Sequence, residues 1–178
     1  MSSLTFSGPI AAYLGWNTLA FFSCFFLNSF IEWVVHRYVM HRPFWSFGYL
    51  HTTSHHAKFG ADSSYETQDP ELKRHVLFTW KEYTLFPLLC LACYAPVELL
   101  LGKPILLGVL LSTLAGLQLF NSLHWRFHVP SDSWIQRRGF FRYLKEHHRL
   151  HHDDMNRNFN VYFLPIADYC LGTLVRQR

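Results

Sequence analysis

The stretch "PIAAYLGWNTLAFFSCFFLNSFI" (Pro9–Ile31) contains no Asp, Glu, Lys or Arg. A helix needs about 20 predominantly apolar residues to cross a bilayer, so this run is long enough. Two further runs resemble it: "YTLFPLLCLACYAPVELLL" (Tyr83–Leu101), in which Glu98 is the only charged residue, and "PILLGVLLSTLAGLQLFNSL" (Pro104–Leu123), which has none. The sequence therefore predicts three transmembrane helices, over 9–35, 83–101 and 104–124. Only Gly102 and Lys103 separate the last two runs, which predicts a tight helical hairpin.

The composition agrees with a membrane protein. Hydrophobic residues make up 50% of the chain and charged residues only 16%, whereas soluble domains carry about 25% charged residues. A cleaved signal peptide is the alternative for the first run. It requires basic residues ahead of the apolar core, and no Lys or Arg precedes Arg37. We therefore expect a retained helix in a single all-α domain over residues 1–178.

The basic residues predict the orientation. Fifteen of the 16 Lys and Arg lie within 37–81 or 126–178, and Lys103 alone lies in the hairpin turn. Cytoplasmic segments collect Lys and Arg, so 36–82 and 124–178 are predicted to be cytoplasmic. Trp33, Trp80 and Trp125 fall near the predicted helix ends. They indicate an interfacial aromatic belt, unless some of them pack in a core. No basic stripe interleaved with aromatic residues is present, so we expect no nucleic-acid partner.

Eleven of the 12 histidines lie in four clusters, all on the predicted cytoplasmic side. The clusters are "HRYVMH" (His36, His41), "HTTSHH" (His51, His55, His56), "HWRFH" (His124, His128) and "HHRLHH" (His147, His148, His151, His152). His75 stands alone and is interpreted as a surface or hydrogen-bonded histidine. A pH switch would set histidines against acids or at an interface, which this repeated spacing does not favour.

If the clusters are helical, their spacing predicts which histidines share a helix face, because each residue turns the helix by about 100°. His124 and His128 would lie about 40° apart on one face. The second and fourth clusters would each span an arc of about 140°, which can turn toward one metal or bridge toward two. His36 and His41 would also be about 140° apart, so either they serve different metals or the helix bends between them.

The count of imidazoles indicates two metal ions, because each half of the chain supplies about five. Neutral imidazole binds Zn, Cu, Fe and Ni, so ligand type alone leaves the metal open. Carboxylates near the clusters could hydrogen-bond the far ring nitrogens. The candidates are Glu32, Glu146, Asp153 and Asp154. Asp153 and Asp154 could equally form a solvated helix end.

As a set, the four clusters resemble the histidine boxes of the fatty acid hydroxylase / sterol desaturase superfamily. The chain has His36-x4-His41, His51-x3-His55-His56, His124-x3-His128, and His147 and His148 before His151-His152. "EWVVHRYVMH" is also similar to the first box of bacterial carotenoid hydroxylases. "NFNVYFLPIADYCLGT" (Asn158–Thr173) is similar to the family's ending, in which an Asn-rich stretch leads to Asp-x3-Gly-Thr.

The resemblance implies a site, a cofactor and an activity. It places metal ligands at His36, His41, His51, His55, His56, His124, His128, His148, His151 and His152, with His147 as a hydrogen-bonding neighbour or second-metal ligand. It implies two iron ions, with zinc possible in purified protein, and O2 as co-substrate. The reaction implied is hydroxylation or desaturation of a lipid, sterol or carotenoid that enters from the bilayer.

The resemblance also bears on partners and location. Electrons would come from a separate donor of ferredoxin or cytochrome b5 type with its reductase, and an oligomer is possible. The membrane would be the bacterial inner membrane or the endoplasmic reticulum.

This chain departs from the family's pattern in two ways. The second cluster has three intervening residues where many members have two, which leaves the role of His51 open. Larger members also have four or more apolar runs, so this chain's substrate pocket is simpler or is completed by a partner.

Two alternatives have other functions. One is a metal-binding membrane protein without redox chemistry, such as a zinc store or transporter. Transporters carry ionisable residues inside their spans, and here only Glu98 qualifies. The other is an inactive family member with a structural role, against which the intact ligand set argues.

Overall fold

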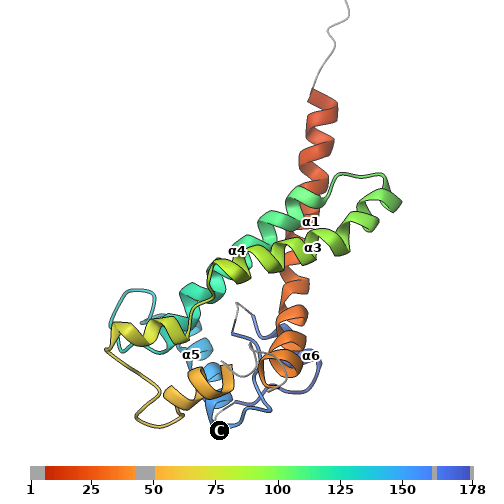
Figure 1. The fold of residues 1–178 in the computed structure, drawn as a ribbon. Coiled ribbons are helices and arrows are strands. Elements are labelled where there is room, and N and C mark those ends of the chain that lie inside the picture. The colour runs from red at the N-terminus through yellow and green to blue at the C-terminus, as the bar shows by residue number, and fades with distance from the viewer. Residues whose placement is uncertain (1–6, 43–50, 162–163, 177–178) are drawn as a thin grey trace, which may run out of the picture. The chain divides into compact units, whose positions relative to one another are not determined.

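The computed structural model describes residues 7–42, 51–161 and 164–176. Within these ranges every regular element is a helix, which confirms the all-α prediction (Figure 1). The elements are α1 (Ser7–Val35), η1 (His36–Met40), η2 (His51–His56), η3 (Pro70–His75), α3 (Trp80–Leu101), α4 (Leu106–Phe127), α5 (Gly139–Asp153) and α6 (Ile166–Cys170). The predicted polar segment 36–82 includes residues 43–50, which lie outside the described ranges.

Three helices, α1, α3 and α4, are long and apolar enough to cross a membrane. Their bounds follow the predicted spans to within three residues, although α4 continues past the predicted end at 124 to Phe127. Large apolar side chains stay exposed along them, including Leu14, Phe22 and Leu88. Such surfaces suit a lipid environment, because hydrocarbon rather than water then surrounds them.

The chain divides into two compact units. The hairpin unit comprises residues 1–28 and 78–117, and the histidine unit comprises 29–77 and 118–178. All 12 histidines lie in the histidine unit. The predicted single domain is therefore built from two parts, each with its own contacts.

In the hairpin unit, the turn between α3 and α4 is formed by Gly102 and Glu98. Gly102 ends α3 in the left-handed conformation (φ 60°), which glycine adopts without steric cost. The Glu98 carboxylate accepts hydrogen bonds from the backbone N–H groups of Ile105 (2.7 Å) and Leu106 (2.9 Å). The single acidic residue of this apolar run thus satisfies backbone donors at the start of α4.

The hairpin unit also holds α1 and α4 close together at Gly108. The Gly108 N–H donates to Asn17 Oδ1 at 2.8 Å. A Cβ at position 108 would lie 2.1 Å from the Asn17 backbone oxygen, so the contact requires glycine.

The core of the histidine unit is aromatic. Trp33, Phe159 and Ala167 form a buried cluster with Phe30 against it. Trp33 is only 6% exposed, and its Nε1–H donates to Thr173 Oγ1 at 2.8 Å. The interfacial-belt prediction is therefore wrong for Trp33, which packs in a core because aromatic partners distant in sequence cover it. Trp80, at the start of α3, is 74% exposed.

Candidate metal centre

Ten histidines converge in two groups of five. The first group contains His36, His41, His51, His56 and His151, and the second contains His55, His124, His128, His148 and His152. Within each group, one ring nitrogen per residue lies within 4.8 Å of all the others. Each half of the ten-imidazole set therefore has the size and the closeness of a single metal site.

Short Nε2–Nε2 distances join members of the first group. His51 Nε2 lies 2.9 Å from His36 Nε2 and 3.2 Å from His56 Nε2. His41 Nε2 lies 3.1 Å from His151 Nε2.

The second group shows the same separations. His55 Nε2 lies 3.1 Å from both His124 Nε2 and His152 Nε2. His148 Nε2 lies 3.2 Å from His128 Nε2 and 3.1 Å from His152 Nε2. Imidazole nitrogen binds a metal such as zinc at about 2.0–2.1 Å, so adjacent ligands at right angles would lie about 3.0 Å apart. Both groups fit the edges of such a coordination polyhedron.

For two members of the second group, hydrogen bonds of the far ring nitrogens decide which nitrogen would face a metal. His128 Nδ1–H donates to the Tyr65 carbonyl at 2.9 Å, and His152 Nδ1–H donates to the Phe59 carbonyl. In the neutral ring the Nε2 of each then carries a lone pair. Lone pairs that face one another at about 3 Å repel, and a cation between them reverses the sign of that interaction.

The first group has matching anchors. His36 Nδ1–H donates to the Phe159 carbonyl, and His151 Nδ1–H donates to the Arg157 carbonyl at 2.6 Å. Metal-ligating histidines commonly donate their other N–H in this way, which fixes the tautomer and the ring orientation. The donor set of both groups therefore suits a metal ion.

The first group depends on two turns of π-helix. η1 contains His36, and the backbone N–H of His41 donates to the His36 carbonyl at 3.2 Å, five residues back. A π-turn takes one more residue than an α-turn, so residues five apart lie nearly above one another. His36 and His41 consequently join the same group. Of the two alternatives for this pair, different metals or a change in the helix between them, the structure favours the second.

η2 repeats this arrangement. It is also a π-helix, and it places His51 and His56, again five apart, in the first group. His55 instead joins the second group. The second cluster therefore turns toward both groups and not toward one. The structure also places a ring nitrogen of His51 among the converging nitrogens of the first group.

The second group uses ordinary α-helical spacing. His124 lies in the last turn of α4 and His128 four residues later, directly after the helix, and His148 and His152 lie four apart on α5. α5 also sends His151 to the first group. The second and fourth clusters therefore each contribute histidines to both groups.

His147 and His148 have different positions. His148 is fully buried among the second group. His147 is also buried, but its Nε2 lies 3.1 Å from Asp168 Oδ2 and it belongs to neither group. The geometry thus places His147 as a hydrogen-bonding neighbour.

The four carboxylates that the sequence suggested as partners of the far ring nitrogens have other contacts or are exposed. Glu32 accepts from Asn160 Nδ2 and the Val161 N–H, and Glu146 pairs with Arg149. Asp153 and Asp154 are exposed at the end of α5, which favours the solvated helix end. The far-nitrogen partners described above are backbone carbonyls, which sequence patterns do not reveal.

Asp168 is a residue beside the two groups that sequence reasoning did not single out. It is fully buried. Burial alone would raise the pKa of its carboxyl, but hydrogen bonds from His147, Thr173 and the Asn160 backbone lower that pKa below its usual value. The available signal was the Asp-x3-Gly-Thr ending, of which Asp168 is the first residue.

Burial keeps the clustered imidazoles neutral. It lowers the pKa of His41, His151 and His152 to about 3 and that of His128 to about 4, with neighbouring histidines adding to the effect at His41, His151 and His152. The pKa values of His51, His55, His56 and His148 are lowered for the same reason. Neutral imidazole is the form that binds metals.

His75 takes no part in either group. Its Nδ1 contacts Ser54 Oγ, and its Nε2 lies 3.4 Å from Arg74 Nε. This agrees with its interpretation as a hydrogen-bonded histidine outside the site.

Comparison with known protein families gives a match over most of the chain. The family described as "Fatty acid hydroxylase" matches residues 21–173, which include all four histidine clusters. No curated protein and no solved structure matches the chain.

Proposed function

The chain belongs to the fatty acid hydroxylase family, and from this membership and its two histidine groups we propose that it is a membrane-bound, O2-dependent non-haem di-iron oxidoreductase. Its reaction would be the hydroxylation or desaturation of a lipid, sterol or carotenoid. The observation that carries the proposal is the convergence of two sets of five buried or partly buried imidazoles, in which neighbouring Nε2 atoms lie about 3 Å apart.

The chain's own residues would prepare this chemistry in three ways. The ten histidines would hold two metal ions through neutral nitrogens, so the ions keep their positive charge. The backbone carbonyls of Phe59, Tyr65, Arg157 and Phe159 hold four of the rings in orientation. Burial excludes bulk water from most of the ligands. Bound iron would supply the activation of dioxygen, with electrons from a separate ferredoxin or cytochrome b5 type donor.

The proposed topology places the histidine-rich face in the cytoplasm and the substrate in the bilayer. The excess of Lys and Arg in 37–81 and 126–178 supports this sidedness. The membrane would be the bacterial inner membrane or the endoplasmic reticulum. Exposed apolar side chains on all three candidate spans support direct contact with lipid.

The test combines product analysis with ligand variants. Lipids from cells with and without the gene, grown under 18-O2, should differ by a labelled hydroxyl or a new double bond. His128→Ala and His152→Ala should abolish this product while the protein still inserts. His75→Ala is the matched control and should leave the product unchanged.

The same experiment separates the alternatives. Full product formation by both ligand variants would exclude the assignment. If purified wild-type protein binds metal but cells make no oxidised lipid, a zinc store or transporter or an inactive structural member gains support. Glu98 does not support the transporter alternative, because its carboxylate accepts hydrogen bonds from backbone N–H groups at the start of α4.

A further inference from the structure

We infer that Asp168 is a positioning residue for the first histidine group, acting on His36 through the peptide bond between Phe159 and Asn160. The inference rests on the proposed function, because it concerns how a metal ion would be held there. Asp168 itself touches no member of either group in the contacts described above.

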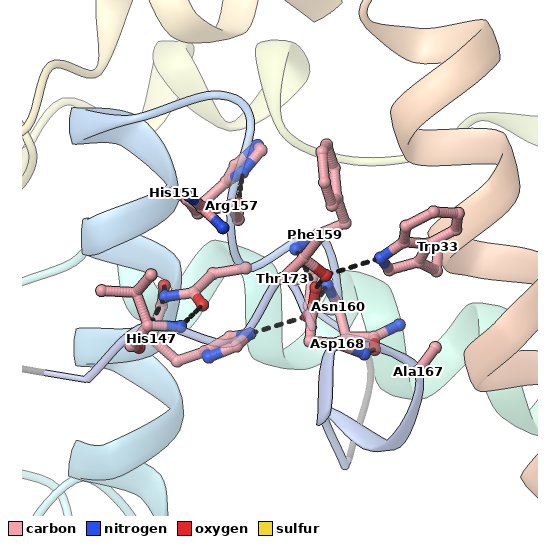
Figure 2. Close-up of polar contacts among 12 residues, drawn as sticks. Trp33, His147, His151, Arg157, Phe159, Asn160, Ala167, Asp168 and Thr173 are labelled. Atoms are coloured by element: carbon pink, nitrogen blue, oxygen red, sulfur yellow. Dashed lines mark hydrogen bonds and ion pairs between the residues drawn. The ribbon is translucent and has the colours of Figure 1, made fainter. Parts of the chain in front are cut away.

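Asp168 gathers four donors in a buried site (Figure 2). Its Oδ1 accepts from the Phe159 N–H at 2.9 Å and from Thr173 Oγ1 at 2.6 Å. Its Oδ2 accepts from the Asn160 N–H at 2.8 Å and from His147 Nε2 at 3.1 Å. An ionised carboxylate has about four lone-pair sites, so this one is fully used.

One of these bonds leads directly to a candidate ligand. The Asn160 N–H and the Phe159 carbonyl belong to the same peptide group. The N–H donates to Asp168, and the carbonyl accepts from His36 Nδ1. A negative charge on the N–H side polarises the peptide and strengthens its carbonyl as an acceptor. His36 is thereby held more firmly, and its Nε2 becomes a stronger donor to a metal.

The same chain segment also anchors His151. The Arg157 carbonyl accepts from His151 Nδ1, two residues before Phe159. Between them, Asn158 adopts a left-handed conformation (φ 52°), and its Oδ1 accepts from the Val175 N–H at 2.7 Å. Segment 157–160 thus carries two carbonyl anchors of the first group, and Asp168 holds its end in place.

The second group has separate anchors. The carbonyls that hold His152 and His128 belong to Phe59 and Tyr65. None of the four donors to Asp168 comes from segment 59–65. Loss of the Asp168 charge should therefore weaken the first group selectively.

The test is Asp168→Asn in the full-length protein, titrated with Co²⁺ and followed by its absorption spectrum. The amide has nearly the same shape, but it carries no charge and has only one accepting oxygen, so it cannot accept from all four donors that the carboxylate binds. We expect about 10-fold or more loss of affinity at one Co²⁺ site, the range typical for partners of metal ligands, with the other site unchanged. His151→Ala identifies the spectrum of the first group, and Asp132→Asn is the matched control because Asp132 is an exposed carboxylate of the same unit, paired only with the exposed Arg137 in the contacts of the described residues.

Three results would overturn the inference. They are equal weakening at both sites, unchanged affinity at both sites, or weakening confined to the second group. If wild-type protein binds no Co²⁺, the proposed function fails with it. If Asp168→Asn does not fold, Thr173→Val removes one donor to the same carboxylate, and it should weaken the same site by a smaller factor. Unchanged binding in that variant would then overturn the inference.

Discussion

The two histidine groups use the same residue type and the same ring nitrogen, but different backbones. The first group takes its pairs from π-turns at spacing five, His36 with His41 and His51 with His56. The second takes its pairs from α-helices at spacing four. The first is anchored by a buried segment under Asp168, and the second by segment 59–65, where Asp62 and Ser64 form an exposed turn. Equivalent ligand sets can thus be reached by unlike local structures.

The most direct way to break this comparison is to remove one ligand from each group. His151→Ala should lower metal binding at the first group, and His148→Ala should do so at the second. Under the proposed di-iron function, each should also abolish activity. Metal content of the purified variants measures the effect, and His147→Ala should retain two ions per chain. Two retained ions in His148→Ala would contradict the assignment of that residue.

Changes in spacing test the difference between the π-turns and the α-turns. Inserting one Ala between Trp125 and Arg126 should rotate His128 by about 100° and abolish metal binding at the second group. Deleting Val39 should convert η1 toward an α-turn, in which His36 and the following histidine remain on one face. We expect that deletion to weaken the first group by only about 10-fold, because the orientation is altered but not lost. Equal loss in both variants would contradict this expectation, because it would show that an α-turn cannot replace the π-turn in the first group.

Acid should destabilise the metal-free protein through both groups. The pKa is lower in the folded state than in the unfolded chain, where it is about 6.5, for eight histidines of the two groups: His41, His51, His55, His56, His128, His148, His151 and His152. The unfolded chain therefore binds more protons, and the free energy of unfolding falls as the pH drops below about 6.5. The fall should continue to about pH 4 and 3, where His128 and then His41 and His151 titrate in the folded state. Denaturant unfolding in detergent at several pH values measures this, and a stability that is flat between pH 7 and 4 would contradict it.

The smallest expected effect leaves the comparison between the groups intact. Gly108→Ala should lower the free energy of unfolding of the hairpin unit by about 1–3 kcal/mol, because the alanine Cβ would overlap the Asn17 backbone oxygen. The ratio of metal bound by the two groups should not change, since this contact lies outside the histidine unit. Thermal unfolding and metal content measured on one preparation provide the check. Unequal metal loss would show that the helix contact affects one group more than the other.

The sequence predicted what depends on local composition. The three apolar runs predicted the long helices, and the clusters identified the ten convergent histidines. The family resemblance narrowed the choice to His148 over His147. A fixed 100° per residue left two alternatives open for His36 and His41, because it does not allow for the π-turn that the backbone adopts there. Nothing in the sequence of that turn alone distinguishes it from an α-turn.

Other features depend on contacts between distant residues. Trp33 is buried because Thr173 and Phe159 reach it from more than a hundred residues away. Asp168 gains its importance from the peptide groups of Phe159 and Asn160 folding back over it. The carboxylates nearest to the clusters in sequence therefore did not identify the hydrogen-bond partners of the histidines, because residues close in sequence are not always close in space.

Glu98 has a consequence for how the hairpin enters a membrane. A hydropathy scale counts this side chain as a penalty in the second span. Its carboxylate nevertheless binds the two amides of Ile105 and Leu106 that the start of α4 would otherwise expose. Unsatisfied amides cost several kcal/mol each in hydrocarbon. The acid therefore offsets part of its own insertion cost, and α3 and α4 are suited to insert together as one preformed hairpin.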